Sequence, residues 1–382
     1  MQERHIETRE QLETLCQDIG HSPWLALDTE FMREKTYYPQ LCLLQLCNGD
    51  IAASIDPLAL ESLDPLMEIL YDPEVIKIFH AGSQDLEIFH LLWKRLPSPL
   101  FDTQLAAALL GLGDQVGYAN LVQQLLDHQL EKGHTRTDWS RRPLDQDQLR
   151  YALDDVIYLG EIYPLLQQRL QAQGRSEWLQ EDFCLLADPA SYAVAPQTTW
   201  KKIKGRQRLK GVQLAVLQAL SGWREEQAIR ADRPRRWILK DDVLLELSRR
   251  QPVDHKALRR VRGLEEGIIK RSGDRLLKLI AQAKALPRNQ WPVEQRPALR
   301  LSSNQEAVTD LLMCGLRLLA GQARITPSAI ASRRELERLV AGDRDNLELL
   351  GGWRRKVAGD ALLRVLAGEL TPRIQAGKAT LV

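Results

Sequence analysis

The chain has 382 residues, of which 44% are hydrophobic and 27% are charged, and this length suggests about two or three globular domains. It contains no apolar run of ~18 residues that could span a membrane, and its charged N-terminus lacks the apolar centre of a secretory signal. The five cysteines are scattered and form no CxxC pair. This argues against a zinc site or a disulfide framework and predicts a cytoplasmic protein.

The net charge of +1 conceals two halves of opposite sign. Residues 1–199 contain 14 Lys and Arg against 31 Asp and Glu, a net charge of −17, whereas residues 200–382 contain 38 against 20, a net charge of +18. A strongly basic half is typical of proteins that bind a polyanion, most simply nucleic acid. The alternative is that the two halves dock on each other through their opposite charges.

Three apolar segments near the N-terminus predict strands. They are LALDTEF at 25–31, LCLLQLC at 41–47 and IAASIDP at 51–57. The second and third are joined by Asn48-Gly49-Asp50, and Asn-Gly between apolar runs is a strong hairpin signal. We therefore expect the three strands to form an antiparallel meander.

The following segments alternate between strand and helix. Residues 75–81 predict a short strand, 83–96 an amphipathic helix, 100–112 a strand end and a helix, and 144–170 a long helix. This alternation predicts an α/β domain with a mixed sheet over residues 1–190.

The remainder of the chain has a different pattern. A basic linker is expected at 191–209, and beyond it the strand signals stop and the apolar spacing is helical. A proline-rich segment at 286–297 divides this half in two. We expect two small all-α helical-bundle domains, at 210–288 and 298–378.

The two helical pieces resemble a degenerate repeat. GDRLLKLI at 273–280 matches GDALLRVL at 359–366, and Val261 matches Leu347 at the same offset. Solenoid units are typically ~20–50 residues long. The matching segments here lie farther apart than that, which favours duplicated small domains over a solenoid.

Asp28 and Glu30 stand out because they lie inside the first apolar strand. Residues i and i+2 of a strand project to one face, so both carboxylates point the same way. Two carboxylates this close raise each other's pKa, and a divalent cation between them reverses that penalty. The alternative for an isolated D-x-E is an acidic pair on an exposed sheet face.

Other candidate site residues lie on the predicted helices. Asp85 lies early in its helix, where it either turns toward the sheet end or interacts with the helix dipole. Tyr151 and Asp155 are spaced i, i+4 on one helix face, where they either join the site or act as a core aromatic and an exposed acid. Asp154 is expected to be solvated. Asp102, near a strand end, is expected to have a structural role rather than to be a ligand.

Four carboxylates and a tyrosine without a His or Cys cluster favour Mg²⁺ or Mn²⁺ over zinc. Two such ions can clamp the attacking and leaving oxygens of a phosphodiester during in-line displacement. The Tyr151 hydroxyl is a poor base at neutral pH, because its free pKa is ~10. We therefore assign it to orienting the attacking water. The predicted metal ligands are Asp28, Glu30, Asp85 and Asp155.

A family resemblance is carried, in chain order, by LALDTEFMREKTYYPQLCLLQL, IFHAGSQDLEIF, LFDTQLAAALLG, TDWSRRPLDQDQLRYALDDVIYL and the two C-terminal repeats. They resemble the ribonuclease D family, in the tyrosine-containing subgroup of the DEDD exonucleases. The D-x-E motif of that family falls on Asp28 and Glu30, and the aspartate of its second motif falls on Asp85. Its Y-x-x-x-D motif falls on Tyr151 and Asp155, so all five catalytic positions are retained.

The resemblance implies an α/β ribonuclease H-like exonuclease domain, a mixed sheet flanked by helices, followed by two HRDC-like domains that often bind nucleic acid. It implies hydrolysis of RNA from the 3′ end, with release of nucleoside 5′-monophosphates. It also implies 3′ trimming of tRNA precursors and other structured RNAs. The expected partner is therefore RNA with an accessible 3′ end. No membrane is involved, and the chain is expected to act as a monomer.

Two other functions stay open from the residues themselves. One is a DNA 3′→5′ exonuclease of the same superfamily, because the catalytic residues do not distinguish the sugars. The other is a non-catalytic RNA-binding scaffold that keeps the fold without the activity.

Secondary signals lie outside the main motifs. Trp139, Arg141 and Arg142 precede the long helix, where they either contact a base and a phosphate or form a packed loop. The basic run KKIKGRQRLK at 201–210 either follows RNA or is a solvated linker. His80, just before the Asp85 helix, is expected to be structural.

Overall fold

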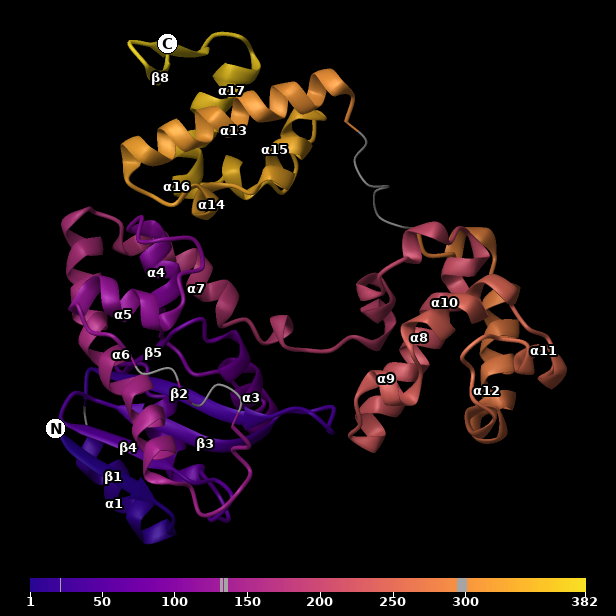
Figure 1. Cartoon of the computed structure of the whole chain (residues 1–382), viewed down its shortest axis with the longest axis horizontal. Helices are drawn as coiled ribbons and strands as arrows, with labels where there is room; N and C mark the ends of the chain where they lie inside the picture. Colours follow the sequence, from indigo (N-terminus) through magenta and orange to yellow (C-terminus); the bar gives the residue numbers. More distant parts are fainter. Residues whose placement is uncertain (21, 131–132, 134–136, 294–300) are drawn as a thin grey trace. The chain divides into compact units, whose positions relative to one another are not determined.

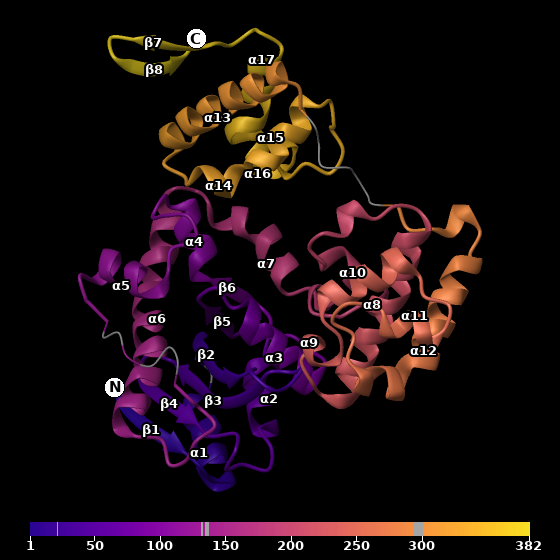
Figure 2. The ribbon, with the colours of Figure 1, turned by 45° about the vertical axis from the view of Figure 1, so that its right-hand side comes forward.

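The chain forms two compact units in the computed structural model, shown in Figure 1 and, turned by 45°, in Figure 2. The first unit contains Met1–Met32, Leu41–Tyr192 and Leu299–Val382, and the second contains Arg33–Gln40 and Ala193–Ala298. None of the described helices is both long and apolar enough to cross a membrane. The structure describes the whole chain except residues 21, 131–132, 134–136 and 294–300.

A six-stranded mixed sheet forms the base of the first unit. Its strands are β1 Gln2–Ile6, β2 Trp24–Met32, β3 Gln40–Cys47, β4 Ile51–Ile55, β5 Ile76–Phe79 and β6 Leu100–Asp102. Their order is β1-β4-β3-β2-β5-β6. β3 and β4 are antiparallel, as the Asn48-Gly49 turn predicts, whereas β5 is parallel to β2 and β6. The expected mixed sheet is confirmed.

The sequence reading missed an edge strand and a helix at the N-terminus. β1 runs parallel to β4, and it is followed by α1 (Arg9–Ile19). α1 begins with a capping box, in which the Thr8 hydroxyl accepts from the backbone N–H of Gln11 and the Gln11 side chain accepts from the N–H of Thr8. This T-x-x-Q pattern is visible in the sequence and predicts a helix start.

Different helices cover the two faces of the sheet. On one face, α1 and α3 (Ser83–Trp93) share a core with Leu25 and Leu27 of β2. On the other face, α6 (Gln146–Ala172) contacts β2, β4 and β5 and shares its core with Ala26 (Figure 1). Successive side chains of β2 therefore face α3 and α6 in alternation. The other helices here are η1 Asp64–Leu66, α2 Met67–Leu70, α4 Thr103–Leu109, α5 Tyr118–Leu126, η2 Ser176–Leu179, α7 Gln180–Leu186 and η3 Pro189–Ser191.

The C-terminal segment of the first unit is mostly helical. Its elements are α13 Ser303–Ala323, α14 Pro327–Ile330, α15 Arg333–Val340, η7 Glu348–Leu350, α16 Gly352–Arg354, a π-helical turn η8 Arg355–Gly359, α17 Asp360–Leu366, and the strands β7 Pro372–Gln375 and β8 Lys378–Leu381. β7 and β8 form an antiparallel hairpin, so the expectation of no strand in this half is wrong. Its loop residues Ala376 and Gly377 both have positive φ, as a two-residue hairpin loop requires. Ala-Gly is a much weaker signal for such a loop than Asn-Gly.

This C-terminal segment packs on the sheet-containing part of the same unit. Apolar side chains of α13 to α17 belong to the core that contains α4 and α6. The buried guanidinium of Arg175 donates to the carbonyls of Leu109 (2.7 Å) and Ala323. An ion pair also joins Arg354 to Asp182 at 2.8 Å. The segment is therefore part of the folded body of the first unit.

The second unit is a helical bundle. Its helices are η4 Pro196–Lys202, η5 Arg206–Arg208, α8 Val212–Ala231, α9 Arg235–Ile238, α10 Asp241–Arg250, α11 His255–Arg259, α12 Glu266–Ala285 and η6 Arg288–Gln290. The stretch expected as a basic linker, 191–209, contributes Trp200, Ile203 and Leu209 to the same core as α8. The lysines and arginines between these apolar residues concealed their packing role.

The two repeat glycines both lie in close contact with another segment, but with different kinds of atom. A Cβ on Gly273 would lie 2.7 Å from the ring of His255, and a Cβ on Gly359 would overlap the carbonyl oxygen of Leu349. Gly359 therefore requires glycine, because the backbone of another segment approaches it, whereas a side chain at position 273 would require the His255 ring to move. The matched pair Val261 and Leu347 is buried in both repeats. The two segments therefore share a buried apolar position as well as similar sequence.

Candidate active site

Three of the predicted ligands come together between β2 and α6. Asp28, Glu30 and Asp155 each offer a carboxylate oxygen, and these three oxygens lie within 4.8 Å of one another. Asp28 and Glu30 project from β2 toward the face that α6 covers, and Asp155 lies on α6. The i, i+2 spacing on the strand thus places both side chains against the helix, as the sequence predicts.

Asp85 approaches from the other face and is not part of this trio. It lies in the first turn of α3, and its carboxylate accepts a hydrogen bond from the Thr29 hydroxyl, which projects from β2 opposite to Asp28 and Glu30. The helix start is fixed by Asp102, whose carboxylate accepts from the N–H of Gly82 at 3.0 Å. A Cβ on Gly82 would lie only 2.5 Å from that of Phe79, so this tight entry into α3 requires glycine.

The structural role expected for Asp102 is thereby observed. Besides holding Gly82, it caps α4 by accepting from the N–H groups of Gln104 and Leu105 at 2.9 and 3.1 Å. Its buried carboxylate is satisfied by three backbone donors, and it connects the starts of α3 and α4.

Burial makes it costly to ionise all four carboxylates. Burial, followed by the charges of Asp85 and Asp155, raises the pKa of Asp28 well above 3.8. Burial and the charge of Asp155 raise the pKa of Glu30 to about 8. Burial likewise raises the pKa of Asp155 to about 7 and that of Asp85 to about 6, the latter against the opposing Thr29 hydrogen bond. These groups release their protons readily only when a positive charge lies among them.

The donor set fits a hard divalent cation. It consists of carboxylate oxygens from Asp28, Glu30 and Asp155, with Asp85 adjacent across the strand, and it includes no thiolate or imidazole. Oxygen-only sites of this kind suit Mg²⁺ or Mn²⁺. Burial and the neighbouring carboxylates raise the pKa values of Asp28 and Glu30, and a bound cation would oppose both effects.

A cavity of about 510 Å³ opens onto the trio. Tyr151 lines it together with Asp28, Glu30 and Asp155, so the structure places the predicted tyrosine beside the carboxylates. The Tyr151 ring packs against Trp139 with their centroids 6.2 Å apart. The cavity is large enough for a nucleotide-sized ligand.

The sequence reading missed two residues that support the site. The Thr29 hydroxyl holds Asp85, and the Tyr118 hydroxyl donates to the backbone carbonyl of Asp154 at 3.0 Å. Burial, with the charges of Asp155 and Asp28, raises the pKa of Tyr118 well above 10, so this phenol stays protonated as a donor. Thr29 lies within the D-x-E motif itself, but nothing in the sequence around Tyr118 reveals its role.

His80 and Asp154 also line the cavity. His80 Nδ1 lies 2.9 Å from the Thr103 hydroxyl, and burial lowers the pKa of the imidazole, which favours its neutral form. Asp154, which was expected to be solvated, is partly exposed and forms an ion pair with Arg150, one turn earlier on α6. The i, i+4 spacing of Arg150 and Asp154 accounts for this pair.

Trp139 and Arg142, in the loop before α6, were expected either to contact a base and a phosphate or to form a packed loop. The structure shows the packed loop. Trp139 is 3% exposed and packs with Cys42 and Leu43. Arg142 donates to both carboxylate oxygens of Asp56 and to backbone carbonyls. Neither side chain is therefore available to a nucleic acid.

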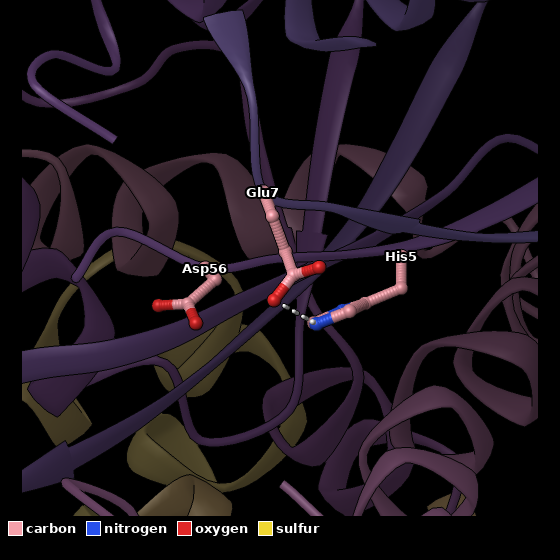
Figure 3. Close-up of side chains that lie close together, drawn as sticks. All are labelled: His5, Glu7 and Asp56. Carbon is pink, nitrogen blue, oxygen red and sulfur yellow. Dashed lines mark ion pairs between the residues drawn. The ribbon is translucent and has the colours of Figure 1, made fainter. Parts of the chain in front are cut away.

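A second cluster of possible metal ligands lies where β1 and β4 end, and it consists of His5, Glu7 and Asp56, with one ligand atom of each within 4.8 Å of the others (Figure 3). His5 pairs with Glu7 at 3.8 Å, while both oxygens of Asp56 accept from Arg142. Burial raises the pKa of Asp56, but the hydrogen bonds from Arg142 outweigh it and hold the pKa below 3.8. Asp56 already has its positive charge, so this cluster is an ion-pair network.

Comparisons with known proteins agree with this architecture. A family model described as 3′-5′ exonuclease matches residues 4–171, and one described as HRDC domain matches residues 213–280. Ribonuclease D of Gluconacetobacter diazotrophicus is 41% identical over 367 residues, which cover 96% of this chain and 93% of that protein. Ribonuclease D of Nitrobacter hamburgensis is 35% identical and covers 99% of this chain and 98% of its own length.

Solved structures give the same result. The crystal structure of Escherichia coli RNase D, described as an exoribonuclease involved in structured RNA processing, matches with a TM-score of 0.84 and 34% identity over 96% of this chain and 99% of that chain. The catalytic core of RRP6 from Trypanosoma brucei, at 23% identity and a TM-score of 0.58, shares the fold. This chain therefore belongs to the ribonuclease D family, as an exoribonuclease that joins a 3′-5′ exonuclease domain to an HRDC domain.

Proposed function

We propose that this exoribonuclease removes nucleoside 5′-monophosphates one at a time from the 3′ end of RNA, at a site formed by Asp28, Glu30, Asp85, Tyr151 and Asp155. The observation that carries this proposal is the trio of carboxylate oxygens within 4.8 Å of one another, partly buried beside a nucleotide-sized cavity. Grouping partly buried acids with raised pKa values destabilises the folded state, and cation-dependent phosphodiester hydrolysis would explain why the fold retains them.

Each residue has a distinct part in this proposal. Asp28, Glu30 and Asp155 would hold Mg²⁺ or Mn²⁺, and Asp85, kept in place by Thr29, would complete a site for two ions. When bound, the cations supply the positive charge that lowers the pKa of the attacking water and stabilises the leaving 3′ oxygen. The Tyr151 hydroxyl would orient that water from its place in the same cavity.

The substrates we propose are structured RNAs with an accessible 3′ end, including tRNA precursors. Support comes from the description of the E. coli relative and from the net charge of +18 in residues 200–382, which favours binding of a polyanion. We further infer that the chain acts in the cytoplasm, because all five cysteines are free. We expect it to act as a monomer, which light scattering after size exclusion would test. The second repeat is expected to be HRDC-like, as its matched packing glycine suggests.

The test uses the full chain and a 5′-labelled RNA hairpin with a single-stranded 3′ tail. With Mg²⁺ the labelled product is expected to shorten one nucleotide at a time, and chelation is expected to stop the reaction. Asp155→Asn is expected to lower the rate more than about 100-fold, because loss of a ligand exceeds the cost of losing an outer-shell partner. Glu161→Gln, which changes an exposed acid on the same helix, is the matched control.

Three results would contradict the proposal. Undiminished activity of Asp155→Asn would remove the site assignment. Internal cleavage products would remove the exonucleolytic direction. Faster degradation of a DNA oligomer of the same sequence would favour the DNA exonuclease alternative.

A further inference from the structure

The second unit contains a cavity of about 540 Å³ that the proposed active site does not explain. Its walls come from the segment 33–40, from η4 and the residue after it, and from the stretch that begins α9, which is labelled in Figure 2. The residues that matter here are Arg33, Tyr37, Lys202, Arg235, Arg236 and Trp237. Five cationic side chains line the cavity against two carboxylates, so it carries excess positive charge.

One wall is held rigidly by a buried acid. Glu225 is 0% exposed, and it accepts from the Tyr37 hydroxyl and from Arg235 Nε at 2.8 Å. The Arg235 guanidinium lies over the Tyr37 ring, 5.1 Å from its centroid. Asp232 accepts from the backbone N–H groups of Tyr37 and Tyr38 at 3.0 and 3.1 Å. The segment 33–40 is thus fixed in place, and the charges of Arg235 and Glu225 neutralise each other.

Two other cationic side chains line the cavity without an ion-pair partner among the described residues. Arg224 is paired with Asp241, but among the described residues neither Arg236 nor Lys202 has a carboxylate within ion-pair distance. Both side chains are exposed. They are therefore available to an anionic ligand.

Trp237 lies beside these cations and is 58% exposed. A tryptophan ring usually contributes to a core, and leaving this much of it in water gains the fold little. An exposed ring next to free cations matches the way in which proteins hold single-stranded nucleic acid, where bases stack on aromatic rings and phosphates are neutralised nearby. An acidic peptide would engage the cations but would have no such use for the ring.

We propose that this cavity binds a single-stranded segment of RNA, with a base stacked on Trp237 and the neighbouring phosphates neutralised by Arg236 and Lys202. It rests on the proposed function only in naming RNA as the polymer. The cavity would provide a specific binding site, in addition to the nonspecific attraction of RNA by the basic half of the chain. The fixed segment 33–40 forms the wall against which the strand lies.

The experiment measures binding without hydrolysis. The full chain carrying Asp155→Asn is titrated into a 5′-fluorescein-labelled single-stranded RNA 12-mer in EDTA, and anisotropy is followed over a series of KCl concentrations. Adding Trp237→Ala is expected to weaken binding about tenfold, as loss of one stacked base does, without changing the salt dependence. Trp237→Phe, which keeps a ring, is expected to recover most of the affinity.

The cations are expected to behave differently from the ring. Arg236→Gln should reduce the slope of log K against log salt by about 0.7, the value for one phosphate contact on a single strand. Lys278→Gln removes an exposed cation from α12, outside the cavity, and is the matched control for charge. Thermal melts of every variant establish that it is folded.

Affinities of Trp237→Ala and Arg236→Gln within twofold of the parent would overturn the inference. A reduced salt slope with no effect of Trp237→Ala would overturn the stacking site and leave only nonspecific attraction. Equal competition by polyglutamate, insensitive to Trp237→Ala, would favour an acidic protein partner and overturn it as well. This experiment measures binding and not cleavage. If RNA bound as expected but the wild type released no nucleotide in the separate cleavage assay, the proposed function would be contradicted and this inference would stand.

Discussion

Replacing Glu30 with glutamine is expected to stabilise the metal-free protein at neutral and alkaline pH, although it removes a site residue. The pKa of Glu30 is raised from 4.5 to about 8, mainly by burial. Because the folded state holds its proton more tightly than the unfolded state, this carboxyl does not oppose folding below pH 4.5. Its penalty grows as the pH rises to about 8 and is constant above that. Glutamine keeps the shape without the charge.

The size of the effect follows from the two pKa values. Each pH unit between 4.5 and the pH of measurement costs about 1.4 kcal/mol until the folded pKa is reached, so at pH 7 the penalty is about 3 kcal/mol. Urea denaturation in EDTA, followed by circular dichroism at pH 5 and pH 7, measures the difference between wild type and Glu30→Gln. Glu61→Gln, an exposed acid in a loop, is the control.

The same unfolding experiment is repeated with Mg²⁺ in place of EDTA. Mg²⁺ is expected to stabilise the wild type more at pH 8 than at pH 6, because protons compete with the cation for the same carboxylates. Glu30→Gln is expected to lose most of this gain. If Glu30→Gln changed the free energy of unfolding equally at pH 5 and pH 7, the carboxylates would not be under electrostatic strain, and the reasoning for a cation site would fail.

Two further predictions concern residues around this site and the body of the unit. Tyr151→Phe is expected to lower kcat by up to about 100-fold, the cost of misplacing a reacting atom, without weakening Mg²⁺ binding. Single-turnover kinetics measures the rate and calorimetry measures the Mg²⁺ affinity. An equal loss of metal affinity would refute an orienting role. Arg175→Ala is expected to destabilise the first unit by about 2 kcal/mol, because a buried carbonyl of Leu109 and a partly buried carbonyl of Ala323 lose their donor. Urea midpoints compared with Arg169→Ala, on the exposed face of α6, test this; matching midpoints would show that Arg175 does not hold the C-terminal segment.

The catalytic strand could be read from the sequence because local physics determines it. The apolar flanks of LALDTEF predict a buried strand, and the strand period of two places Asp28 and Glu30 on one face. The spacing of Tyr151 and Asp155 is likewise local to one helix. The side from which Asp85 approaches could not be read, because it depends on which face of the sheet α3 covers. That choice is made by tertiary packing, and it places Asp85 against Thr29 rather than within the trio.

The organisation of the second half was harder to predict because its key contacts are distant in sequence. Arg175 and Ala323 are 148 residues apart, and Tyr37 and Glu225 are 188 apart. No local pattern marks either contact, so a linker was expected where Trp200 and Leu209 pack into a core. The many Lys and Arg residues of this basic run are typical of a solvated linker, although the apolar residues between them pack into the core.

The most direct test of the central claim is a crystal structure of the full chain with Mn²⁺ and a short RNA in its 3′ site, measured with anomalous diffraction. We predict two anomalous peaks between the carboxylates of Asp28, Glu30, Asp85 and Asp155, with the terminal phosphodiester of the RNA adjacent to them. Peaks at the His5, Glu7 and Asp56 cluster, or none beside Asp28, would contradict the account.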